Sequence, residues 1–174
     1  RVGFRGYGTG AIVEASRFLQ NVQGAKAAGL EVGVYFFSQA ITPEEARQEA
    51  DYVLSLLESY PITCPVVYDW EPITFAEGAR TDQLENEVLT QCAAAFCQRV
   101  AQAGYTPAVY FNQEMGYFSF DLKELSPFQF WLAEYDSYPS FYYGFTMWQY
   151  THEGRVDGIQ TPVDWNLDFS QLKR

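Results

Sequence analysis

Short apolar segments alternate with amphipathic segments along most of this chain. The apolar segments are rich in β-branched and aromatic residues, as strands are, and the amphipathic segments repeat apolar residues every three or four positions, as helices do. Strands are predicted at residues 2–4, 30–37, 65–69, 106–111, 128–134 and 145–150, and helices at residues 16–28, 43–60 and 83–103. This alternation predicts an α/β fold whose sheet is mainly parallel and covered by helices.

Local signals predict where the helices begin and end. Thr42 lies directly before Pro43 and three residues before Glu45, an arrangement typical of a capped helix start. Gly29 and Gly104 follow the first and third helices, where glycine commonly ends a helix. The acidic residues of the second helix are expected to form a solvated face: Glu44, Glu45 and Glu49.

The composition indicates a single globular domain over residues 1–174. Hydrophobic residues make up 48% of the chain, which is enough for a substantial core. The net charge is −11 and the basic residues do not cluster. Nucleic acid is therefore not expected as a partner, because phosphate neutralisation needs grouped Lys and Arg. A membrane span is not expected either, because the apolar runs are only a few residues long.

Cysteine and histidine are too few, and too widely spaced, to suggest a metal or redox centre. Cys64, Cys92 and Cys97 are odd in number and fit no zinc spacing, so we expect three free, mostly buried thiols. His152 is the only histidine. A histidine-based metal site or a Ser-His-Asp triad is therefore difficult to build. We expect neither a metal nor a cofactor.

Two carboxylates lie at the end of the apolar strand predicted at residues 65–69. Asp69 and Glu71 are two positions apart, so in an extended chain they point the same way, with backbones about 6–7 Å apart. Two acids held that close repel each other, and one of them tends to keep its proton at neutral pH. Glycosidases use such a pair as a general acid and a charged stabiliser. The alternative is a pair of solvated acids at a strand end.

Other polar side chains follow the predicted strands. Parallel strands place ligand sites at their carboxyl ends. Gln39, Asn112, Glu134, Gln149 and Tyr150 all lie at or near such ends. Asn112 is a candidate substrate hydrogen-bonder or else a cap for the next turn, and Glu134 and Gln149 are further candidates for the site.

Aromatic residues make up 18% of the chain. Amphipathic rings near polar groups can form a platform for a ligand, and the C–H faces of sugars suit such rings. Tyr35, Trp131 and Trp148 lie on predicted strands, where either core packing or sugar stacking would explain them.

Six segments, in order along the chain, resemble the glycoside hydrolase family 25 muramidases. They lie at residues 24–37, 68–71, 104–110, 130–135, 148–151 and 163–166, and include Tyr-Asp-Trp-Glu at 68–71 and Val-Asp-Trp-Asn at 163–166. The resemblance implies an irregular, flattened TIM-like β/α barrel of eight strands. It also implies hydrolysis of the β-1,4 bond between N-acetylmuramic acid and N-acetylglucosamine in peptidoglycan, and a parent protein that is extracellular or in the cell wall.

The same resemblance implies roles for three acids. Glu71 would be the general acid that protonates the leaving oxygen, and Asp69 would steady the substrate or the positive charge that develops at the sugar. Asp164 matches the family's late acidic position. The spacing of Asp69 and Glu71 also resembles that of substrate-assisted glycosidases, so we favour attack by the substrate's 2-acetamido group with net retention.

One departure from the family pattern leads to a further expectation. The family opens with a strand carrying Gly-Ile-Asp-Val-Ser or similar, and no such segment is present. We therefore expect a domain that is incomplete at its N-terminus and lacks the first strand, with exposed edges that favour pairing between chains. The alternatives to a muramidase are a catalytically inactive carbohydrate-binding barrel fragment and a barrel hydrolase that acts on another glycan such as chitin.

Overall fold

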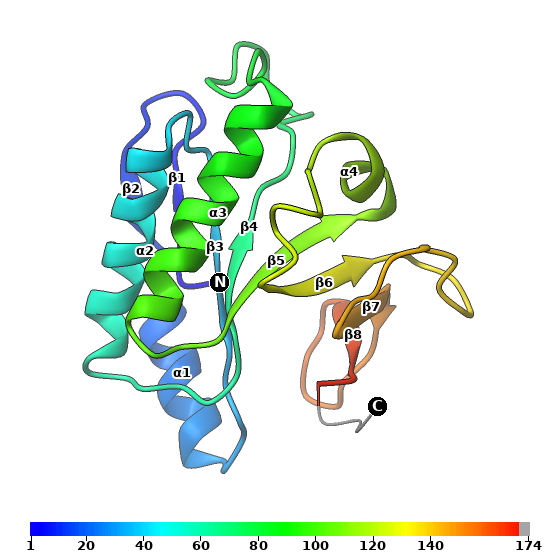
Figure 1. The fold of residues 1–174 in the computed structure, drawn as a ribbon. Helices are drawn as coiled ribbons and strands as arrows, with labels where there is room; N and C mark the ends of the chain where they lie inside the picture. The colour runs from blue at the N-terminus through cyan, green and yellow to red at the C-terminus, as the bar shows by residue number, and fades with distance from the viewer. Residues whose placement is uncertain (171–174) are drawn as a thin grey trace.

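The computed structural model describes residues 1–170 and has twelve secondary-structure elements (Figure 1). In chain order they are β1 (Gly3–Arg5), β2 (Ile12–Glu14), α1 (Phe18–Ala27), β3 (Val34–Phe37), α2 (Pro43–Leu57), β4 (Val66–Asp69), α3 (Asn86–Gln102), β5 (Pro107–Asn112), α4 (Gln113–Phe118), β6 (Gln129–Ala133), β7 (Met147–Gly154) and β8 (Val163–Asp168).

All eight strands join one sheet, in the order β2-β1-β3-β4-β5-β6-β7-β8. The six central strands, β1, β3, β4, β5, β6 and β7, run parallel to one another. The two edge strands are antiparallel to their neighbours, β2 to β1 and β8 to β7. The predicted α/β fold with a mainly parallel sheet is therefore confirmed. The two antiparallel edge strands were not predicted, because β2 has only three residues and β8 follows a segment dominated by turn signals.

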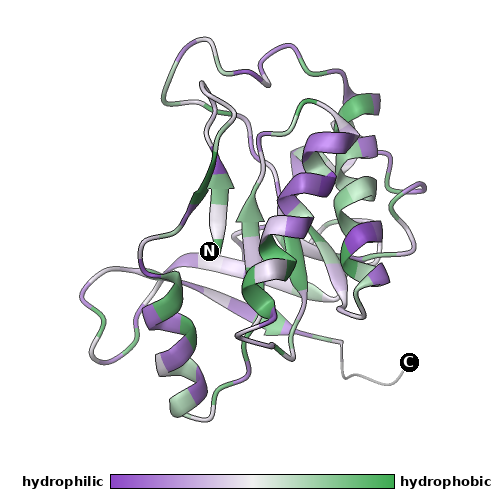
Figure 2. Ribbon diagram, turned by 90° about the vertical axis from the view of Figure 1, so that its left-hand side faces the viewer, coloured by the Kyte–Doolittle hydropathy of each residue, from purple (hydrophilic) through white to green (hydrophobic). Residues whose placement is uncertain are grey.

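The core lies between the sheet and the helices. In Figure 1 the helices α1, α2 and α3 gather beside β1, β3 and β4. All four residues of β4 are buried, as expected for a central parallel strand. Tyr68 of β4 packs on Phe96 of α3, with ring centroids 5.4 Å apart. Figure 2 shows hydrophobic strands behind helices whose surfaces alternate between hydrophobic and hydrophilic residues.

The helix-end signals have the predicted consequences. Thr42 Oγ1 accepts a hydrogen bond from the Glu45 backbone N–H at 3.2 Å, and Pro43 is the first residue of α2. Gly29 and Gly104 have φ angles of 73° and 85°, which favour glycine and end α1 and α3. Several elements are shorter than predicted, since for example residues 30–33 lie outside β3 and residues 83–85 lie outside α3, whereas β7 extends four residues beyond its predicted end.

The expected solvated face of α2 is wrong for two of its three acids. Glu49 is fully buried, where its carboxylate accepts hydrogen bonds at 2.6 Å from Arg5 Nε and from Ser38 Oγ. Glu45 pairs with Arg80 at 2.7 Å. The buried guanidinium of Arg5 on β1 needs an anion close by, and α2 supplies it. Glu44 remains exposed, as expected.

The second part of the chain has less helical cover. After β5, the one helix among residues 1–170 is α4, which has six residues. This agrees with the sequence analysis, in which the last predicted helix ends at residue 103. None of the described helices is long and apolar enough to cross a membrane. The three cysteines are free, as predicted, and Cys92 and Cys97 are buried in α3.

Candidate active site

One face of the sheet gathers the acidic and aromatic side chains. Register places Asp69 of β4 beside Tyr110 of β5, and Tyr110 beside Trp131 of β6. Gln149 of β7 is paired with Asn166 of β8. Side chains alternate between the two faces of a sheet along each strand. The buried Val109 and Leu132 point to the helix side, so Tyr110 and Trp131 point to the opposite face.

A pocket of about 80 Å³ opens on this face. Its lining brings together six of the nine predicted site residues and adds Tyr110: Tyr35, Asp69, Glu71, Tyr110, Trp131, Gln149 and Asp164. A water molecule occupies about 30 Å³ in the liquid, and pockets for drug-sized ligands are typically about 300–1,000 Å³. The pocket is therefore larger than one water molecule but too small for a whole sugar chain.

Asp69 is the most deeply buried acid of the pocket. It ends β4 and is 6% exposed, and its Oδ1 has no hydrogen-bond partner among residues 1–170. Burial raises the pKa of Asp69 well above its usual range, and the charge of Glu71 raises it further, while Arg1 opposes the shift. An unpartnered carboxyl aimed into a pocket is equipped to bind a polar group of a ligand.

Glu71 lies two residues beyond the end of β4 and is more accessible than Asp69. Burial raises the pKa of Glu71, and the charge of Asp164 adds to the shift. The charge of Glu71 therefore acts on the pKa of Asp69, and the charge of Asp164 acts on the pKa of Glu71. A partly exposed acid with a raised pKa is suited to act as a general acid.

A cluster of aromatic rings and amides forms the opposite wall. Tyr110 Oη and Tyr135 Oη both donate to Gln149 Oε1, at 3.0 and 2.8 Å. The Trp131 ring packs edge-on against Tyr110, with centroids 5.2 Å apart, and Trp131 Nε1 donates to Asn166 Oδ1 at 2.9 Å. These contacts hold the indole in one orientation beside the acids.

Sequence reasoning did not predict Tyr110, Tyr135 or Asn166 as site residues. All three lie in or next to segments that resemble the family, but the strand-end criterion overlooked Tyr110, which lies inside β5. The signal that would have found it is the register, since Tyr110 is directly opposite Asp69 on the neighbouring strand.

Three predicted site residues do not line the pocket. Asn112 Oδ1 caps α4 by accepting from the Met115 backbone N–H at 2.9 Å. The Glu134 carboxylate accepts from Ser140 and Phe141 and so holds the loop after β6. Trp148 is 7% exposed and belongs to the core, where its Nε1 donates to the backbone oxygen of Glu134.

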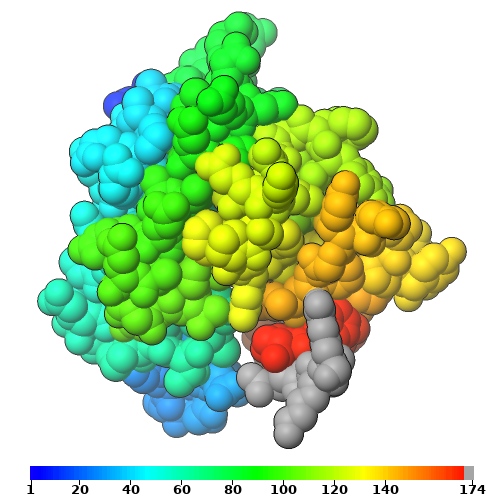
Figure 3. Space-filling model, in the orientation of Figure 1, coloured from blue at the N-terminus to red at the C-terminus, as the bar shows by residue number. Residues whose placement is uncertain are grey.

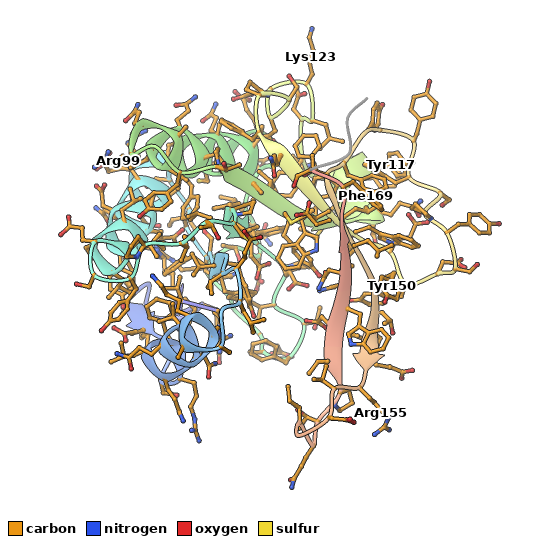
Figure 4. All side chains as sticks on the ribbon, turned by 90° about the horizontal axis from the view of Figure 1, so that it is seen from below. Arg99, Tyr117, Lys123, Tyr150, Arg155 and Phe169 are labelled. Atoms are coloured by element: carbon orange, nitrogen blue, oxygen red, sulfur yellow. The ribbon has the colours of Figure 1, made fainter. Side chains whose placement is uncertain are left out.

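A larger groove of about 810 Å³ runs along the outer side of β6, between residues 116–128 and residues 143–146. In Figure 3 the yellow segment around residue 125 lies beside the orange and red segments of β7 and β8 on this side of the molecule. Figure 4 shows Lys123 of the groove pointing away from the protein. The groove has one acid, Asp121, and no carboxylate pair, so the candidate chemistry belongs to the smaller pocket. No cluster of potential metal-binding side chains occurs within residues 1–170.

Solved structures with similar folds come from bacterial and phage enzymes. The spore cortex lytic enzyme SleM of Clostridium perfringens is 24% identical, with a TM-score of 0.79 over 97% of this chain and 58% of SleM. The modular autolysin LytC of Streptococcus pneumoniae is 23% identical, with a TM-score of 0.76 over 95% of this chain and 39% of LytC. This chain thus spans less than two thirds of either protein. Among curated proteins there is no match.

The barrel-like neighbours agree with the fold implied by the sequence resemblance. The family model that describes glycosyl hydrolases family 25 matches residues 8–159, which is most of the chain and includes Asp69 and Glu71. The chain therefore belongs to glycosyl hydrolases family 25.

Proposed function

We propose that this chain is the catalytic part of a lysozyme-type hydrolase. Its reaction is cleavage of the β-1,4 bond between N-acetylmuramic acid and N-acetylglucosamine in peptidoglycan. The observation that carries the proposal is the buried, unpartnered Asp69 beside the more accessible Glu71 on the floor of one pocket. The family membership and the lytic names of the structural neighbours support it, and LytC has been solved with a synthetic peptidoglycan ligand.

In this proposal Glu71 protonates the oxygen of the leaving sugar. The raised pKa of Glu71 supports this role, because the acid must hold its proton until the glycosidic bond breaks. Asp69 accepts a hydrogen bond from the amide N–H of the 2-acetamido group and orients its carbonyl oxygen for attack at the anomeric carbon. Water then opens the cyclic intermediate with Glu71 as base, which gives net retention.

The rest of the pocket binds and orients the sugar. Burial raises the pKa of Tyr110, so its hydroxyl stays protonated and keeps donating to Gln149. Trp131 and Tyr35 pack edge to face at 6.5 Å and provide apolar surface for the C–H face of a sugar ring. Asp164 adds negative charge near Glu71, which supports both the raised pKa of Glu71 and the stabilisation of a developing cation.

The proposal is tested by the products of peptidoglycan digestion. Mass spectrometry should find N-acetylmuramic acid at the new reducing ends, and NMR at first turnover should show the β-anomer. N-acetylglucosamine at the reducing ends, or preferential cleavage of chitin, would assign a different glycan. An α-anomer at first turnover would rule out the retaining mechanism. Binding to peptidoglycan without any new reducing ends would identify a carbohydrate-binding domain instead.

We propose an extracellular or wall-associated parent protein, since that is where this substrate occurs.

A further inference from the structure

Gln39, just beyond the end of β3, is a fully buried amide whose hydrogen bonds join three segments of the chain. Its Nε2 donates to the backbone oxygen of Ser38 at 2.9 Å and to the backbone oxygen of Glu71 at 3.1 Å. Its Oε1 accepts from Thr81 Oγ1 at 2.6 Å. Both amide protons and the amide oxygen are therefore used, which fixes the orientation of the side chain.

Glu71 needs such a support because it lies outside the sheet. The ladder between β3 and β4 ends with the pair Phe37 and Asp69, and the Ser38 backbone N–H donates to the Asp69 oxygen at 2.7 Å. Beyond that point, the chain leaves the strand and enters the loop of residues 70–85. The hydrogen bond from Gln39 ties the backbone of Glu71 to the residues just beyond β3.

The base of this support is itself rigid. Ser38 Oγ donates to Glu49 of α2 at 2.6 Å and accepts from the Ala40 backbone N–H at 3.2 Å. Glu49 in turn binds Arg5 of β1 at 2.6 Å. Gln39 is thus attached to a buried turn that β1, β3 and α2 hold from three sides. The sequence analysis placed Glu49 on a solvated face and therefore did not predict this connection.

The far end of the same loop is also anchored. Thr81, which donates to Gln39, follows Arg80, and the Arg80 side chain pairs with Glu45 of α2 at 2.7 Å. The Arg80 backbone N–H donates to Tyr7 at 2.9 Å. Gln39 therefore clamps the loop at Glu71 and at Thr81, the two ends of the segment that carries the acid away from β4.

We propose that Gln39 is a positioning residue that fixes the position and orientation of Glu71 at the pocket. This inference rests on the proposed role of Glu71 as the general acid. A displacement of about 1 Å at a reacting group can cost about 100-fold in rate. Loss of the Gln39 bond should therefore slow the chemical step much more than it weakens binding of the glycan.

The test compares variants that keep the size of the side chain but lose its polar atoms. Gln39→Met should lower kcat on soluble peptidoglycan fragments by about 10- to 100-fold and leave KM nearly unchanged. It should also move the alkaline limb of the kcat profile, because the environment of Glu71 changes. The exposed Gln102→Met is the matched control and should behave as wild type.

Two further variants keep the test valid if Gln39→Met folds poorly. Thr81→Val removes the hydroxyl that orients the amide and should reproduce part of the loss in kcat, whereas Thr81→Ser keeps the hydroxyl and should restore it. A folded Gln39→Met or Thr81→Val with wild-type kcat and pH profile would overturn the inference. An unchanged kcat in Glu71→Gln would instead refute the proposed role of Glu71 as the general acid, so the two failures are distinguishable.

Discussion

The two sides of the pocket are built in different ways. The side formed by β1, β3 and β4 carries Asp69 and Glu71, and lies against three helices and a buried polar network that includes Arg5 and Glu49. The side formed by β5 to β8 carries aromatic rings and amides together with one acid, Asp164. Beyond β5, its helical cover among residues 1–170 is the six-residue α4. Figure 1 shows the difference in helical cover between the two sides.

This contrast suggests that the two sides of the pocket have different roles, one in acid chemistry and one in binding the sugar. Acids that must keep a raised pKa need burial and a rigid frame, which the helix-covered side provides. Surfaces that hold a sugar need accessible rings, which strands with little cover can present. Substitutions on the first side should therefore change kcat or stability, and substitutions on the second side should mainly change KM.

The largest effect is expected for Glu71→Gln. Removing the proposed general acid should lower kcat by about 10²–10⁴-fold, while Tm stays near the wild-type value because the amide has the same shape. Release of reducing ends from peptidoglycan measures the rate, and thermal unfolding checks the fold. Glu44→Gln, on the exposed face of α2, is the matched control and should leave both unchanged. An active Glu71→Gln would move the acid to another residue of the pocket.

The next effect concerns the frame of the helix-covered side. Glu49→Leu leaves the guanidinium of Arg5 buried without its anion, which should lower the free energy of unfolding by about 3–5 kcal/mol. The double variant with Arg5→Met should recover much of this loss, because neither charge is then buried. Urea denaturation measures the free energy of unfolding of the single and the double variant. Glu134→Leu provides the comparison on the other side, where the carboxylate accepts from neutral groups of Ser140 and Phe141 and its loss leaves no buried charge without a partner, so it should cost less. Equal losses at the two sites would remove the contrast in rigidity.

A smaller effect, with a distinct pH dependence, is expected for Asp69→Asn. The pKa of Asp69 is raised in the folded protein, so the protonated carboxyl favours folding. That contribution is fully present below the unfolded pKa of about 3.9 and is lost as pH rises through the folded pKa. Asp69→Asn avoids the buried charge and should stabilise the protein at neutral pH by about 1–3 kcal/mol, at the expense of activity.

Urea denaturation from about pH 4 to pH 8 tests whether the stability difference between Asp69→Asn and wild type changes with pH in this direction. The stability difference between Asp69→Asn and wild type should vanish at the acid end and grow toward neutral pH. A constant difference would mean that Asp69 has the same pKa in the folded and unfolded states. It would also remove the argument that the helix-covered side shifts the pKa of Asp69.

The contrast between the two sides also explains what sequence alone could predict. On the helix-covered side, strands and helices alternate with clear periodicity, and the caps at Thr42 and Gly29 are local signals. The pair of Asp69 and Glu71 could be found there from spacing alone. The burial of Glu49 could not, because it depends on Arg5, which is 44 residues away in the sequence.

On the other side, local patterns were less informative. The segment of β8 was not predicted as a strand, and the placement of Asp164 in the pocket depends on its antiparallel pairing with β7. The capping of α4 by Asn112 was foreseen as one of two alternatives, and only the three-dimensional arrangement selects it. The pocket positions of Trp131 and Gln149 likewise follow from the register of neighbouring strands, which no single segment encodes.

The smallest effect is expected on the aromatic side, for Trp131→Phe. The change keeps an aromatic ring against Tyr110 but removes part of the stacking surface and the bond from Nε1 to Asn166. An aromatic contact is worth about 0.5–1.5 kcal/mol, so KM should rise by about 2- to 12-fold with little change in kcat. Trp165→Phe, at a more exposed position on β8, is the matched control and should leave KM unchanged. A fall in kcat without a rise in KM would show that the aromatic wall takes part in the chemical step, because its loss would then act on the transition state alone.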